Sequence, residues 1–108
     1  MASSYGRLAA LRPANTNEAE LYAIPASTEI VGVLEICNQD TVARDISIAL
    51  TDGAGAAAGE DWILYEFELA GNATLTQSPI TAKNGEYIRV QASVADKISF
   101  VLHGLKIT

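Results

Sequence analysis

Apolar and polar residues alternate with a period of two in several runs of this chain, and this feature restricts the fold most. The clearest runs are residues 45–51 and 87–94. Their apolar sets are Ile46, Ile48 and Leu50 in the first run and Ile88, Val90, Ala92 and Val94 in the second. Successive side chains of a strand point to opposite faces, so both runs predict β-strands with one buried face. No segment carries a sustained helical apolar stripe, and only residues 14–19 fit a short helical turn.

Turn-forming residues separate the strand-like runs at short, regular intervals. Asn84-Gly85 is the strongest of these signals, because both residues tolerate the positive φ of a tight turn. The expected strands cover residues 30–37, 45–51, 62–69, 87–94 and 98–107, with weaker patterns at 5–12, 19–24 and 73–78. About eight strands at this spacing predict an all-β chain, a β-sandwich or small barrel, with one domain over residues 1–108. Within it, residues 1–12 form either an edge strand or an N-terminal docking arm.

The segment 52–69 combines a loop and an amphipathic strand. Small residues and glycines in "DGAGAAAGED" predict a mobile, exposed loop at 52–61. In the strand that follows, alternation assigns two faces. One face holds Ile63, Tyr65, Phe67 and Leu69, and the other holds Trp62, Leu64, Glu66 and Glu68.

Some strands are apolar on both faces, which a small sandwich cannot bury alone. In "EIVGVLEIC", one face carries Ile30, Leu34 and Ile36, and the other carries Val31, Val33 and Cys37. The second face therefore predicts a partner, and identical subunits are the simplest one. Arg7 and Arg12 add a local positive patch to the docking-arm segment. The candidate residues for an oligomer or capsid interface are Arg7, Arg12, Val31, Val33, Trp62 and Leu64.

Charge and cysteine content exclude several classes of partner and location. The chain has 13 acidic and 7 basic residues, with a net charge of −6. Phosphate-binding surfaces are basic, so neither a nucleic acid nor an anionic membrane is an expected partner. The single Cys37 cannot form an intramolecular disulfide, which favours synthesis in a reducing cytoplasm. The first residues have no apolar core of a signal peptide, and no run approaches the length of a transmembrane span.

The sequence offers no catalytic or metal-binding set. His103 is the only histidine and Cys37 the only cysteine, so no triad and no zinc site has a local signature. Glu66 and Glu68 are two residues apart and resemble a glycosidase pair, but a solvated sheet face explains them better. Acidic residues beside the 52–61 loop lack the alternate spacing of a calcium loop. We therefore expect no enzyme activity and no cofactor.

The phrase "ELYAIPASTEIVGVLEICNQDTVARDISIALTDG" resembles a recurrent phrase of small virion proteins from tailed bacteriophages. In those proteins a Leu-Tyr-x-x-Pro-Ala turn follows an N-terminal strand, and a strand ending in Asn precedes one ending in Asp-Gly. The matching residues in this half are Leu21, Tyr22, Pro25, Ala26, Asn38, Asp52 and Gly53. The matching segments of the later half are Ser78-Pro79-Ile80 and Asn84-Gly85-Glu86-Tyr87. The similarity covers residues 5 to 108, and the 52–61 segment is its least typical part.

This resemblance implies a jelly-roll-like antiparallel β-sandwich with a structural role in the virion and no enzymatic activity. The leading expectation is a capsid decoration, or cement, protein that binds the outer capsid shell as a homo-oligomer and stabilises it. Many such proteins are trimers, so the expected partners are other copies of the chain and the major capsid protein or another virion protein. The expected location is the virion, assembled in the bacterial host cytoplasm.

Two alternatives remain open from the sequence. The first is a tail, baseplate or head-to-tail accessory protein with the same fold. The second is a glycan-binding module for host attachment, in which Trp62, Tyr65 and the acidic loop form the site, since aromatic rings stack on sugars.

Overall fold

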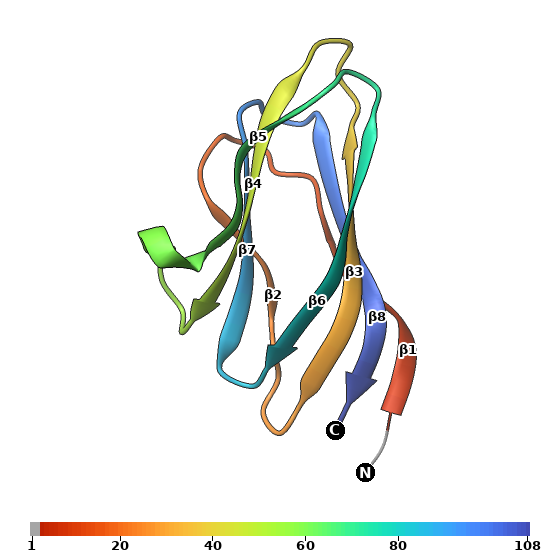
Figure 1. Ribbon diagram of the computed structural model, residues 1–108, viewed down its shortest axis with the longest axis vertical. Coiled ribbons are helices and arrows are strands. Elements are labelled where there is room, and N and C mark those ends of the chain that lie inside the picture. The colour runs from red at the N-terminus through yellow and green to blue at the C-terminus, as the bar shows by residue number, and fades with distance from the viewer. Residues whose placement is uncertain (1–2) are drawn as a thin grey trace.

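Two four-stranded antiparallel sheets pack face to face in the computed structural model, which describes residues 3–108 (Figure 1). The first sheet has the order β1 (Ser3–Leu11), β8 (Ile98–Ile107), β3 (Glu29–Asn38) and β6 (Thr74–Lys83). The second has the order β2 (Ala19–Ala23), β7 (Glu86–Ala92), β4 (Arg44–Asp52) and β5 (Trp62–Leu69). Strand 1 thus pairs with 8, 2 with 7, 3 with 6 and 4 with 5. This nested pairing is a jelly roll, and it confirms the predicted fold class.

All eight expected strands are present, with boundaries that differ by a few residues. The largest difference is in β6, which continues beyond the expected end at residue 78, through Pro79, to Lys83. Residues 3–11 form the edge strand β1, which is one of the two alternatives for the N-terminal segment; residues 1–2 lie outside the described part. Residues 14–19, the one segment whose pattern allowed a short helical turn, form bends that lead into β2. A 3-10 turn, η1 (Gly59–Asp61), precedes β5 instead.

The core lies between the sheets and follows the two-faced pattern of β3. Ile30, Leu34 and Ile36 are at most 1% exposed, whereas Val31 is 46% exposed on the opposite face. Phe100 and Leu102 of β8 lie opposite Ile36 and Leu34 and complete this layer of the core. The period-two reading of β3 is therefore confirmed.

The expected alternation within β5 is wrong, because two register shifts interrupt its pairing with β4. Leu64 lies opposite Ile48 while Trp62 lies opposite Ala49, so Trp62 and Leu64 point to opposite faces. A second shift lies between Leu64 and Phe67 and places Phe67 opposite Ile46. Glu66, within this shift, has a φ of 48°. Each inserted residue reverses the faces of those that follow it.

A buried asparagine joins the end of β3 to two neighbouring turns. The Asn38 side chain is fully buried. Its Nδ2 group donates to the carbonyl oxygens of Val42 at 3.0 Å, Leu69 at 3.0 Å and Ala70 at 3.2 Å. Its Oδ1 atom accepts the backbone N–H of Asp40 at 2.9 Å. One side chain therefore fixes the β3–β4 loop against the β5–β6 turn.

The 52–61 loop is mostly exposed, as expected, but it is attached to the second sheet. The Glu18 carboxylate accepts the backbone N–H of Ala57 at 3.0 Å and forms an ion pair with Arg89 of β7. Glu18 and Arg89 have side chains only 16% and 15% exposed. The pair therefore holds the loop over the outer face of the sheet.

Replacing Glu18 by Gln should release this loop. The variant loses the charge that strengthens both contacts, so local opening becomes more frequent. We expect elastase, which cleaves after small residues, to cut residues 54–58 about tenfold faster, equivalent to about 1.4 kcal/mol of local stability. Glu20→Gln, an exposed neighbour, serves as control. Equal cleavage rates in the two variants would contradict this role of Glu18.

A second ion pair predicts a dependence on pH. Arg44 donates to the Asp40 carboxylate from Nε at 2.9 Å, and the N–H of Thr41 donates to it at 2.7 Å. Arg44 first, and then the Thr41 N–H, lower the pKa of Asp40 below its ordinary value of 3.8. A lowered pKa stabilises the fold above the unfolded-state pKa, and the effect disappears as the pH falls through the folded-state pKa.

The Asp40→Asn variant tests this dependence. Its urea midpoint should lie below that of the wild type at neutral pH, and the two should converge at an acidic pH below the folded-state pKa of Asp40. The effect is small because the pair lies at the surface. The same difference in midpoint at both pH values would show that the charge of Asp40 does not contribute.

Candidate functional site

Five of the six large apolar side chains that are exposed among residues 3–108 gather on two surfaces, and the sixth, Val42, lies in the β3–β4 loop. The first lies on the outer face of the first sheet, where Tyr5 is 76% and Val31 46% exposed. The second is β5, where Ile63 is 47%, Tyr65 60% and Phe67 41% exposed. Apolar side chains that are grouped on a surface often mark protein–protein contacts, so both surfaces are candidate interaction sites.

Strand register places the residues of the first surface in two adjacent rows. Tyr5, Leu105 and Val31 lie side by side on β1, β8 and β3, and Arg7, His103 and Val33 form the next row. We call these six residues the first-sheet surface. His103 Nε2 lies 3.9 Å from the Glu35 carboxylate, whose other oxygen accepts the hydroxyl of Thr76. This surface therefore combines an apolar row with an exposed arginine.

The second surface, which we call the β5 edge, consists of Ile63, Tyr65, Glu66, Phe67 and Glu68. β5 ends the second sheet, so one side of its backbone has no neighbouring strand in that sheet. The rings of Trp62 and Tyr65 lie 5.2 Å apart at an angle of 58°, so they support each other rather than form a flat platform. Leu64 packs against the core.

Of the six interface residues predicted from the sequence, three lie on the first-sheet surface and none belongs to the β5 edge. Arg7, Val31 and Val33 belong to the first-sheet surface, and Arg12 follows β1, where it donates to Gln39 at 3.1 Å. Trp62 and Leu64 are half-buried on opposite faces of β5. The prediction missed Ile63, Tyr65 and Phe67, whose exposure depends on the two register shifts.

Charged residues are distributed unevenly along the chain. Residues 3–12 and 97–108, which contain β1 and β8, hold four of the seven Lys and Arg residues and no Asp or Glu. Residues 45–82, which contain β5, hold six carboxylates and no Lys or Arg. β1 and β5 lie at opposite edges of the sandwich (Figure 1). β1 and β8 therefore carry only basic charged side chains and β5 only acidic ones, whereas β3 carries Glu29 and Glu35 on the outer face of the first sheet.

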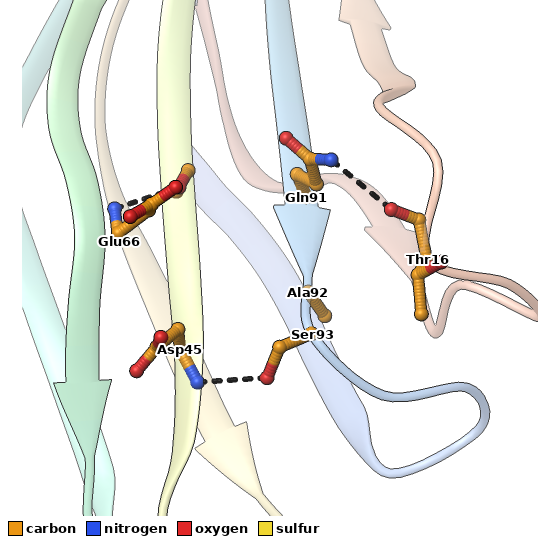
Figure 2. A pocket seen from close by; sticks show the side chains of 7 residues that line it. Thr16, Asp45, Glu66, Gln91, Ala92 and Ser93 are labelled. Atoms are coloured by element: carbon orange, nitrogen blue, oxygen red, sulfur yellow. Dashed lines mark hydrogen bonds between the residues drawn. The ribbon is translucent and has the colours of Figure 1, made fainter.

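A shallow depression of about 300 Å³ lies beside the β5 edge, on the outer face of the second sheet. Figure 2 shows that Asp45 and Glu66 line one side and Gln91 and Thr16 the other. Backbone N–H groups of Asp45 and Glu66 donate to serine hydroxyls, and Gln91 donates to the carbonyl of Thr16 at 3.1 Å. The depression therefore offers carboxylate and amide oxygens to a polar ligand.

Other kinds of site find no support in the described residues. Within residues 3–108 no three His, Cys, Asp or Glu side chains are grouped so that they could hold a metal ion. In the same part of the chain, no helix has the length and apolar character needed to cross a membrane. The lowered pKa of Asp40 has its first cause in the adjacent Arg44, a surface contact, and so does not indicate a catalytic site.

Comparison with known proteins does not identify a family for this chain. No protein-family model matches the chain, and no curated protein matches it. The surfaces described above are therefore the basis for a functional proposal.

Proposed function

We propose that this chain is a structural protein of a tailed-bacteriophage virion. More specifically, we propose a capsid decoration protein. It binds the outer capsid shell as a homo-oligomer, expected to be a trimer, and stabilises the shell. Its partners are other copies of the chain and the major capsid protein. In this role the chain binds by its surfaces, without catalysis or a cofactor.

The two exposed apolar surfaces carry this proposal. Six large apolar side chains are exposed among residues 3–108, and five of them form two groups on different strands, while Val42 lies in the β3–β4 loop. Surfaces of this kind are typical of protein–protein contacts, whereas ligand sites are usually deeper and lined mostly by apolar groups. The jelly-roll fold agrees with the resemblance to small virion proteins, which supports the proposal by analogy of fold.

Two other functions use the same surfaces differently. A tail or baseplate accessory protein would need the same contacts but far fewer copies. A glycan-binding module would use the depression at Asp45 and Glu66, whose oxygens could accept sugar hydroxyl groups. The tilted rings of Trp62 and Tyr65 give that module no flat stacking surface, so it is the weaker alternative.

Copy number in purified particles tests the proposal. Quantitative mass spectrometry of the virion should give hundreds of copies, comparable to the major capsid protein. A dozen copies or fewer would replace the decoration role by a tail role. Complete absence from the particle, together with binding to host polysaccharide on a glycan array, would favour the glycan-binding function.

A further inference from the structure

We propose that Asn84 is a site of spontaneous deamidation, at which the asparagine is converted to aspartate and isoaspartate through a cyclic imide. The site lies in the turn between β6 and β7, which connects the first sheet to the second. The inference goes beyond the proposed function and does not depend on it, because it concerns the chemistry of a single turn.

The reaction needs only water and the atoms of the turn. The backbone nitrogen of Gly85 loses its proton and attacks Cγ, the side-chain carbonyl carbon of Asn84. A new C–N bond forms, the bond from Cγ to the amide nitrogen breaks, and ammonia leaves. Water then opens the imide at one of its two carbonyl carbons. Opening at the backbone carbonyl gives isoaspartate, and opening at Cγ gives aspartate.

The two reacting groups are exposed and have no hydrogen-bond partners. Asn84 and Gly85 are both exposed at the surface. Within residues 3–108, neither the Asn84 side-chain amide nor the Gly85 N–H forms a hydrogen bond. Neither group therefore has to lose a partner before the nitrogen attacks.

Gly85 also leaves space around the carbonyl group that is attacked. Its φ of 91° belongs to a region that glycine adopts readily and other residues rarely adopt. Nothing lies within 4 Å of the position that a Cβ atom of this residue would occupy. Asn84 is the only asparagine of the chain that is followed by glycine.

The other four asparagines are followed by nitrogens that are less able to attack. The N–H groups of Gln39 and Ala73, which follow two of them, donate to backbone carbonyls at 2.7 and 3.2 Å. The remaining two precede Thr16 and Glu18, whose side chains hinder the approach. We therefore expect Asn84 to react first.

Conversion changes both the charge and the backbone of this turn. Either product carries a carboxylate, and residue 84 lines a shallow depression together with Glu29. In isoaspartate the main chain runs through the former side chain and gains one carbon atom. The Glu86 carboxylate, which accepts the N–H of Lys83 across the turn at 2.8 Å, then spans a longer segment. The connection between the sheets therefore becomes more acidic and less tightly held as the protein ages.

Incubation of the folded chain in mildly alkaline buffer, followed by mass spectrometry of its peptides, tests the site. The peptide that contains residue 84 should become one mass unit heavier, and isoaspartyl methyltransferase should label it. Reaction at Asn72 first requires the hydrogen bond of the Ala73 N–H to open. If this local opening costs about 1.4 kcal/mol, Asn84 converts about tenfold faster than Asn72.

Two variants separate the effect of the structure from that of the sequence. Asn84→Gln should abolish the label, because glutamine would have to form a larger ring. Ala73→Gly gives Asn72 the same following residue but keeps the backbone hydrogen bond. Asn72 in this variant should therefore still convert more slowly than Asn84, and the difference should disappear in urea. Circular dichroism verifies folding, and the wild-type comparison of Asn84 with Asn72 is sufficient if Ala73→Gly does not fold.

The outcomes are distinct from those that test the proposed function. Preferential conversion of Asn84, with the isoaspartate label lost in Asn84→Gln, would support the inference. An Asn84 amide that stays intact in the folded chain while it converts in urea would overturn it, as would conversion no faster than that of Asn72. The proposed function is judged independently, by the number of copies in the particle.

Discussion

Replacing Asn38 by Asp should lower the free energy of unfolding by about 3–5 kcal/mol, the cost of leaving a buried charge without a partner. Aspartate has the shape of asparagine but, when ionised, no N–H groups to donate. The carbonyls of Val42, Leu69 and Ala70 would lose their donor and face a carboxylate in a fully buried site. Urea denaturation measures the change, and a lower midpoint with an unchanged slope is expected.

Asn84→Asp is the matched control for this substitution. It makes the same chemical change at an exposed position in the β6–β7 turn, where a change of at most about 0.5 kcal/mol is expected. Similar midpoints for Asn38→Asp and Asn84→Asp would show that the Asn38 side chain does not hold the two turns together.

Replacing Gly104 by Ala should destabilise the fold by about 2–3 kcal/mol, as overpacking does in a well-packed interior. Gly104 of β8 lies opposite Gly32 of β3, so two residues without side chains meet at the centre of the first sheet. A Cβ atom on Gly104 would lie 2.4 Å from the carbonyl oxygen of Val31 and 2.5 Å from Cα of Gly32. Both are backbone atoms, so the strands must move apart to accept it.

Gly59→Ala provides the comparison, because nothing lies within 4 Å of a Cβ atom at that position. Thermal unfolding should show a clear loss for Gly104→Ala and little change for Gly59→Ala. Equal melting temperatures would mean that β3 and β8 do not approach as closely as the structure indicates.

The strands and the core could be predicted from the sequence because period-two alternation is a local signal. β3 illustrates this, since its buried and exposed faces follow directly from "EIVGVLEIC". The face of each β5 residue could not be predicted, because the two register shifts are defined only by its pairing with β4. Alternation therefore assigned Trp62 and Leu64 to one face when they point to opposite faces.

Contacts between residues distant in sequence also could not be predicted from the alternation of apolar and polar residues. Asn38 reads as an ordinary turn residue, and its partner Leu69 is 31 positions away. Glu18 and Arg89 are separated by 71 positions, so nothing local indicates that they hold the 52–61 loop. The charge asymmetry between residues 45–82 and the two ends of the chain is visible in the sequence. That these segments lie at opposite edges of one sandwich could not be predicted, because it depends on the order of the strands in the sheets.

Cryo-electron microscopy of a phage particle that encodes this chain tests the proposed structural role on the capsid most directly. If the proposal is correct, jelly-roll densities of this chain lie on the outer surface of the shell. They repeat over the capsid lattice and contact the major capsid protein. Density confined to the tail or baseplate, or a complete shell with no such density, would contradict it.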